Sequence, residues 1–127
     1  MAPSASILVV EDEPTTKALI QYKLKNSGYE VHSVSDGTEG LAYLEHQVPD
    51  LIILDLMMPV MSGKEFLLEL RRREVHGDIP VIILTAKTME KDVLEGLALG
   101  ADDFVKKPFS PPELLARVKT LLARRSR

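Results

Sequence analysis

Several features are absent from this chain, and each absence removes a class of protein. Its 127 residues include no cysteine, which excludes disulfide bonds and thiolate metal sites. No apolar run approaches the roughly 18 residues that span a bilayer. The opening residues Met-Ala-Pro-Ser-Ala-Ser also lack the apolar centre of a signal peptide. We therefore expect a cytoplasmic protein with no membrane segment.

A large excess of either charge is also absent. The net charge of −3 provides no basic surface for nucleic acid or for an anionic membrane. Direct nucleic-acid binding by this domain is therefore not expected. The length and a hydrophobic content of 45% fit one globular domain with a real core. We expect a single domain over residues 1–127, with a core of about 5–123 and with 124–127 as a tail or linker stub.

The chain does contain four short apolar runs, each followed by side chains capable of chemistry. Residues 7–10 lead to Glu11-Asp12, 51–54 to Asp55, 81–84 to Thr85, and Phe104-Val105 to Lys106-Lys107. Uninterrupted runs of this kind suit parallel strands that are buried on both faces. Ligands bind at the carboxyl ends of the strands in an open α/β sheet. The sequence therefore predicts three carboxylates, a hydroxyl and an ammonium along one edge.

Helix signals separate these runs. We expect helices from Pro14 to about Ser27, after Asp36–Glu39, from Ser62 through Arg73, from Thr88 to Gly100, and after Ser110–Glu113. The three segments 36–39, 62–65 and 110–113 have the spacing of a capping box. The second helix is expected to turn Leu41, Leu44 and Val48 inward. Residues 30–34 are expected to form a further strand.

Five strands then alternate with five helices. Short right-handed crossovers require a parallel sheet with helices on both faces. The order 2-1-3-4-5, known from flavodoxin and a chemotaxis regulator, is adopted by analogy. The predicted fold class is α/β, a flavodoxin-like doubly wound five-stranded parallel sheet with five helices.

The acidic residues at the predicted edge need a counter-charge. Glu11, Asp12 and Asp55 would repel one another, and without compensation at least one would take up a proton. Mg²⁺ resolves this, because it binds carboxylate and carbonyl oxygens and keeps several waters. It would also neutralise an incoming phosphoryl group and let an aspartate act as nucleophile. Thr85 and Lys107 would contact the phosphoryl oxygens, as a donor and as a point charge.

Five separated motifs together resemble a known family. They are Glu11-Asp12, Asp55 with Met58-Pro59, Gly63, Thr85-Ala86 and Lys107-Pro108-Phe109. In this order they are similar to the signature of a two-component response regulator receiver domain. Segments 100–104 and 110–114 look most like receivers of transcription factors with winged-helix outputs. The resemblance covers nearly the whole chain.

The resemblance implies a role for each matching residue. Asp55 would be the phospho-acceptor, Asp12 would bind Mg²⁺ directly, Glu11 would bind it through water, and the carbonyl of Met57 would complete the ligands. Mn²⁺ would substitute for Mg²⁺. Thr85 and Phe104 would form the switch, and the Lys107–Pro108 peptide would be cis. The phosphoryl donor would be a sensor histidine kinase or a phosphotransfer protein.

The family also implies a surface for self-association, formed by the fourth helix and the last strand and helix. Asp103 and Arg117 are expected to pair across a two-fold axis. Glu113 is the acidic half of a second pair, whose basic partner is replaced by Val93. We therefore expect at most a weak homodimer on phosphorylation.

Other interpretations remain open from the residues alone. Taken singly, each site residue is typical of a loop, a turn or a solvated surface. A hydrolase of the aspartyl-phosphate type would carry an Asp-x-Asp motif, whereas Asp55 is followed by Leu56-Met57. A phosphorylation-independent interaction module would not need the acidic site, Thr85 or Lys107. A flavodoxin-like electron carrier is disfavoured because tryptophan and a Ser/Thr-rich phosphate loop are missing. The favoured interpretation is a signalling switch and not an enzyme.

Overall fold

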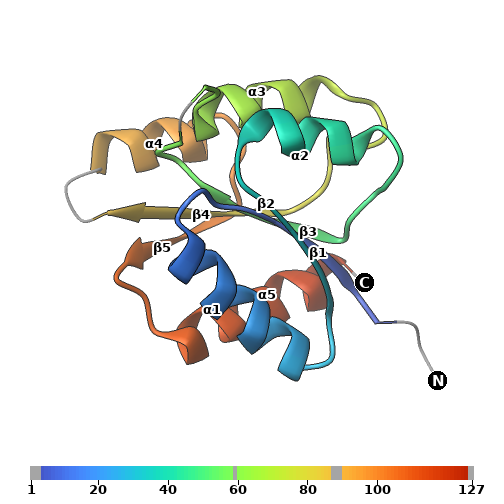
Figure 1. Cartoon of the computed structure of the whole chain (residues 1–127). Helices are drawn as coiled ribbons and strands as arrows, with labels where there is room; N and C mark the ends of the chain where they lie inside the picture. The colour runs from blue at the N-terminus through green and yellow to red at the C-terminus, as the bar shows by residue number, and fades with distance from the viewer. Residues whose placement is uncertain (1–3, 59, 87–89, 126–127) are drawn as a thin grey trace.

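The structure is a computed structural model that describes residues 4–58, 60–86 and 90–125. Strands and helices alternate along this part of the chain (Figure 1). They are β1 (Ser6–Val10), α1 (Pro14–Asn26), β2 (Glu30–Val34), α2 (Gly37–Leu44), β3 (Leu51–Asp55), α3 (Gly63–Arg72), β4 (Val81–Ala86), α4 (Glu90–Ala98), β5 (Asp103–Lys107) and α5 (Pro111–Arg125). The expected alternation of five strands with five helices is confirmed.

The strands form one parallel sheet in the order β2-β1-β3-β4-β5, as predicted. Helices α2, α3 and α4 cover one face, and α1 and α5 cover the other (Figure 1). Asp55 is paired with Leu84, and Thr85 with Lys106. The register therefore brings the polar residues after β1, β3, β4 and β5 to the same edge.

The apolar runs form the centre of the sheet because both of their faces are covered. All five residues of β3 are buried. Alternate residues of the same strand enter different cores: Ile52 and Leu54 face α3, whereas Ile53 faces α5. Phe66 fills the first core and Val118 the second, and both are fully buried. Two cores on one sheet hold the strand ends in fixed positions.

Local signals determine where the helices begin. Ser62 and Glu65 form the complete expected capping box of α3. At the start of α2, the Asp36 side chain accepts a hydrogen bond from the amide of Glu39. The Glu39 carboxylate accepts from the amide of Ser35, so only half of the capping box predicted for 36–39 forms. The Ser110 hydroxyl accepts the amide of Glu113 at 3.4 Å, as predicted for α5.

One expectation about packing is wrong, and another concerns the end of the chain. Val48 does not turn inward, because α2 already ends at Leu44; Val48 is 51% exposed and Pro49 is buried instead. Within the expected tail, Arg124 and Arg125 are exposed but still belong to α5, and the Arg125 guanidinium donates to the Asp50 carbonyl at 3.1 Å. Residues 126–127, the expected helix start at Thr88 and Pro59 of the family motif lie outside the described residues.

Two further features can be compared with expectation. The Lys107–Pro108 peptide is cis, as the resemblance implied. Among the described residues, no helix combines the length and the apolar character that crossing a membrane requires.

Candidate functional site

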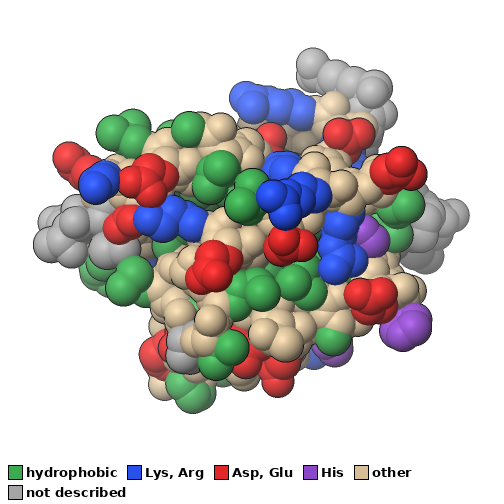
Figure 2. Space-filling model, turned by 90° about the horizontal axis from the view of Figure 1, so that it is seen from above, with side chains coloured by type: hydrophobic (Ala, Val, Ile, Leu, Met, Phe, Trp, Pro, Cys, Tyr) green, Lys and Arg blue, Asp and Glu red, His purple; other side chains and the backbone are tan. Residues whose placement is uncertain are grey.

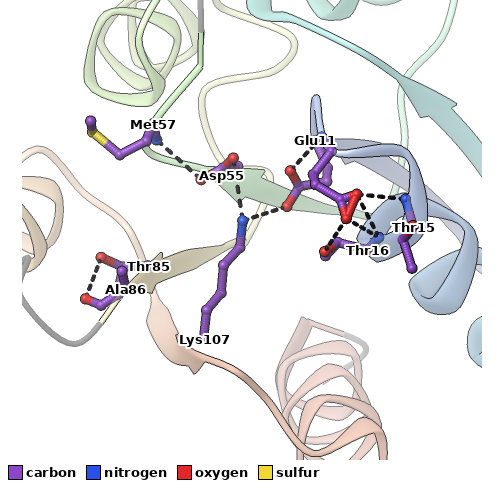
Figure 3. Close-up of polar contacts among 9 residues, drawn as sticks. Glu11, Thr15, Thr16, Asp55, Met57, Thr85, Ala86 and Lys107 are labelled. Atoms are coloured by element: carbon purple, nitrogen blue, oxygen red, sulfur yellow. Dashed lines mark hydrogen bonds and ion pairs between the residues drawn. The ribbon is translucent and has the colours of Figure 1, made fainter.

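The carboxyl ends of three strands bring oppositely charged side chains together (Figure 3). Glu11 follows β1, Asp55 ends β3 and Lys107 ends β5. The Lys107 ammonium lies 2.8 Å from Glu11 Oε1 and 3.4 Å from Asp55 Oδ2. Glu11 is fully buried and Asp55 is 3% exposed. These side chains therefore interact with little screening by water.

A third carboxylate completes the cluster. Carboxylate oxygens of Glu11, Asp12 and Asp55 all lie within 4.8 Å of one another, as the sequence predicted. Asp12 is the most exposed of the three. When all three are ionised, the single charge of Lys107 leaves a net charge of −2. This donor set of hard oxygens with a double negative charge fits a divalent cation such as Mg²⁺.

The buried position of Asp55 changes its acidity. The pKa of Asp55 is raised to about 7, chiefly by burial and also by the nearby Glu11 carboxylate. The Met57 amide, which donates to Asp55 Oδ1 at 3.0 Å, and the Lys107 ammonium act in the opposite direction. At neutral pH Asp55 is thus partly protonated when no cation is bound. A cation would favour the ionised form that a nucleophile requires.

Lys107 stays charged in this setting. Burial lowers its pKa, but hydrogen bonding to Glu11 and the charges of Asp55 and Glu11 outweigh burial, so the net shift is upward. A permanently positive group beside Asp55 suits an incoming anion.

Backbone contacts hold the acidic residues in place. Glu11 Oε2 accepts the amide of Glu13 at 3.0 Å, and Glu13 in turn caps α1. On the other side, α3 approaches β3 so closely that a Cβ on Gly63 would lie 2.6 Å from the carbonyl oxygen of Asp55. Only glycine permits this approach, which explains why Gly63 belongs to the site although it carries no reactive group.

The two predicted switch residues, Thr85 and Phe104, line one groove. Thr85 is 2% exposed and its hydroxyl donates to the Ala86 carbonyl at 3.3 Å (Figure 3). A contact between this hydroxyl and a phosphoryl group on Asp55 would therefore need a rotation of the Thr85 side chain. Phe104 is half-buried and lines a groove of about 210 Å³ together with Thr85 and residues of α4. Thr85 thus forms part of the wall of this groove.

The predicted interface residues already have partners within the chain. The Arg117 guanidinium donates to both carboxylate oxygens of Asp103 at 2.9 Å and to Glu113 at 3.2 Å. The second contact follows from the i, i+4 spacing on α5. The expected pairing across a two-fold axis stays a prediction, and it would require these internal pairs to exchange partners.

The sequence analysis did not identify two residues that hold the helices around the site. Glu13 caps α1, and its signal was present, because an acidic residue directly before Pro14 is typical of a helix start. Lys64 on α3 pairs with Asp92 and Glu95 on α4. Its partners are 28 and 31 residues away, so no local pattern revealed them.

Comparison with known proteins agrees with this geometry. The profile of the response regulator receiver domain matches residues 7–119. The chain is 49% identical over 118 residues to the alkaline phosphatase synthesis transcriptional regulatory protein PhoP of Bacillus subtilis, covering 93% of this chain and 48% of that protein. It is 48% identical over 118 residues to the phosphate regulon transcriptional regulatory protein PhoB of Rhizobium meliloti, covering 93% and 52%. The chain therefore spans about half the length of these curated relatives.

Solved structures give the same result. A putative response regulator from Chloroflexus aurantiacus superposes with a TM-score of 0.91 at 32% identity, covering 94% of this chain and 98% of that one. The receiver domain of a sensor histidine kinase from Pseudomonas aeruginosa, solved with a magnesium ion coordinated in its active site cleft, gives 0.87 at 32% identity, with coverage of 94% and 98%.

Receiver domains are signalling domains that act as phosphorylation-activated switches and bind Mg²⁺ at an acidic pocket, and they interact with histidine kinases. The site found here has an acidic pocket that contains a buried aspartate and lies beside a lysine. With its fold, its site and its relatives in agreement, the chain belongs to the response regulator receiver domain family of two-component systems.

Proposed function

We propose that Asp55 is the phospho-acceptor of this receiver, and that it takes the phosphoryl group from a phosphohistidine. The donor is a sensor histidine kinase or a phosphotransfer protein. A carboxylate oxygen of Asp55 bonds to phosphorus, the bond from phosphorus to the histidine nitrogen breaks, and the imidazole leaves with the electron pair. The observation that carries this proposal is the buried Asp55 carboxylate, which belongs to the acidic cluster and lies beside the Lys107 ammonium.

The residues around Asp55 have separate roles in this proposal. Asp12, Asp55 and the Met57 carbonyl would hold Mg²⁺ directly, and Glu11 would hold it through water. When bound, the ion supplies positive charge against the phosphoryl oxygens. Lys107 exchanges part of its interaction with Glu11 for a contact to a phosphoryl oxygen. The tight pairing of these two residues at 2.8 Å supports the view that Lys107 acts as the resident counter-ion before phosphorylation.

The proposed response to phosphorylation involves Thr85 and Phe104. The added group carries about −1.5 to −2 charges and attracts the Thr85 hydroxyl. Rotation of Thr85 away from the Ala86 carbonyl opens space for Phe104, since both residues line the same groove. The surface formed by α4, β5 and α5 changes as a result. Through this surface the domain controls an output domain or a partner protein, as in a transcriptional regulator.

Labelling with a small phosphoryl donor tests the assignment. Wild type should be phosphorylated by acetyl phosphate or phosphoramidate in the presence of Mg²⁺ or Mn²⁺, and labelling should stop in chelator. Asp55→Asn should abolish labelling, while Asp12→Ala should weaken metal binding. Asp78→Asn, the same change at an exposed position, serves as the matched control. Undiminished labelling of Asp55→Asn would overturn the proposal.

A further inference from the structure

Helix α4 is only lightly anchored to the sheet. Of its residues Glu90–Ala98, only Val93 and Gly96 are buried, and Leu94 is 68% exposed. Gly96 lies directly on Ile83 of β4, where a Cβ would overlap the Ile83 side chain. A short helix with so small a buried side gains little from apolar packing. Its position therefore depends on contacts from neighbouring elements.

The strongest polar contact to α4 comes from Lys64 in the first turn of α3. Its ammonium lies 2.7 Å from Asp92 Oδ1 and 2.8 Å from Glu95 Oε2. The two carboxylates raise the pKa of Lys64, so the group is charged at neutral pH. Figure 2, which views the α2–α3–α4 face, shows acidic and basic side chains side by side toward the α4 end. A single cation held by two carboxylates on successive turns favours one position and one rotation of α4 relative to α3.

Lys64 also stands on a rigid base beside the acceptor aspartate. The preceding Gly63 touches the backbone of Asp55 and Leu56, and the complete capping box fixes the start of α3. Phe66, two residues further on, is fully buried. The Lys64 ammonium therefore connects the frame of the Asp55 site to α4. The inner side of α4 in turn closes the groove that holds Thr85 and Phe104.

We propose that the Lys64–Asp92–Glu95 bridge is a tether that holds α4 in its resting position. Through it, Lys64 sets the proportion of unphosphorylated molecules that display the activated surface. This inference rests on the proposed function of the same domain. These two short ion pairs would lengthen if α4 moved away from Lys64, so the bridge favours the resting arrangement. Lys64 is a positioning residue, because it does not contact the reacting atoms.

The tether can be cut without changing the phosphorylation site. Lys64→Met keeps most of the side-chain stem and removes the charge. Arg72→Met is the matched control, because Arg72 also lies on α3 but pairs only with Glu69 of the same helix among the described residues. The measurement is amide hydrogen exchange of α4 in unphosphorylated protein at low and high salt. Lys64→Met should exchange about three- to tenfold faster in α4 at low salt, because a partly exposed charge network has a modest, salt-screened effect.

Three further measurements test whether the effect comes from the ion pairs of Lys64. At about 1 M salt the difference between Lys64→Met and wild type should shrink, because the Debye length falls to about 3 Å. The double variant Asp92→Asn/Glu95→Gln, which keeps Lys64, should show the same acceleration. On phosphorylation, the additional change in α4 exchange should be smaller in Lys64→Met than in wild type. Equal α4 exchange in Lys64→Met and wild type, or an equal acceleration in Arg72→Met, would overturn the tether.

Failure of the tether and failure of the proposed function give different results. The exchange measurement on unphosphorylated protein does not depend on Asp55 accepting a phosphoryl group. Labelling of wild type and Lys64→Met by acetyl phosphate is measured in parallel. Normal labelling with unchanged α4 exchange rejects the tether alone, whereas absent labelling of both proteins with accelerated exchange rejects the proposed function alone.

Discussion

Replacing the acceptor aspartate by asparagine should stabilise the metal-free protein at neutral and alkaline pH. In the folded protein the pKa of Asp55 is raised from 3.8 to about 7, chiefly by burial and then by Glu11. The folded state therefore holds a proton that the unfolded state has lost between these two pH values. In this window the free energy of unfolding of wild type falls as the pH rises. Asparagine has the same shape and carries no charge at any pH.

The size of this stabilisation follows from the pH range between the unfolded and folded pKa values of Asp55. This range spans about three pH units, and each tenfold change corresponds to about 1.4 kcal/mol, which sets a ceiling of about 4 kcal/mol. We expect Asp55→Asn to raise the free energy of unfolding by about 2–4 kcal/mol at pH 8 and by less than half as much at pH 5. Mg²⁺ should reverse the order, because a cation that binds only folded wild type stabilises it by mass action.

Urea denaturation in chelator tests this prediction at pH 5, 6, 7 and 8. Asp78→Asn, an exposed position, is the control and should follow wild type at each pH. If Asp55→Asn were no more stable than wild type at pH 8, or if its gain were the same at pH 5 and pH 8, a buried Asp55 with a raised pKa would be refuted.

Three further predictions follow from individual contacts. Gly63→Ala should lower the free energy of unfolding by about 1–3 kcal/mol in urea, because the new Cβ overlaps the Asp55 carbonyl; unchanged stability would show that α3 can retreat freely. Thr85→Ala should accept phosphate from acetyl phosphate but lose the exchange response of α4, and a wild-type response would exclude Thr85 as the relay to Phe104. Wild type should sediment as a monomer at micromolar concentration and self-associate weakly when phosphorylated; a tight dimer insensitive to both phosphorylation and Arg117→Ala would contradict the interface.

The strands could be predicted from the sequence because burial on both faces leaves an unambiguous pattern. Residues 51–54 contain no polar side chain, and all four are fully buried in the structure. The strand order was less directly accessible. Crossover rules give a parallel sheet, but the order 2-1-3-4-5 came from analogy with a known fold and was then confirmed.

Helix ends were harder to predict than helix starts. A capping residue marks a start locally, as Ser62 does for α3. The end of α2 has no comparable signal, and an apolar residue four positions after Leu44 continues the helical period whether or not the helix continues. Val48 was therefore assigned inward by periodicity, although the chain has already left the helix there.

The composition of the site could be predicted, but its electrostatics could not. Strand ends at one sheet edge place Glu11, Asp55 and Lys107 together in any fold of this class. The raised pKa of Asp55 depends on how completely the surrounding side chains exclude water, which is a property of packing in three dimensions. The orientation of Thr85 toward the Ala86 carbonyl is likewise a choice between staggered rotamers that no residue pattern fixes.

The sequence also does not show which surface charges pair with one another. Asp103 and Arg117 were assigned to a pair across a two-fold axis and Glu113 to a second pair, and both assignments stay predictions. In the structure the Arg117 guanidinium already binds both acidic residues within one chain. A dimer that uses these charges therefore replaces pairs within one chain by pairs between two chains. The gain in free energy of association is then only the small difference between two exposed ion pairs. This exchange favours weak association that depends on a change in the surrounding surface, as a switch requires.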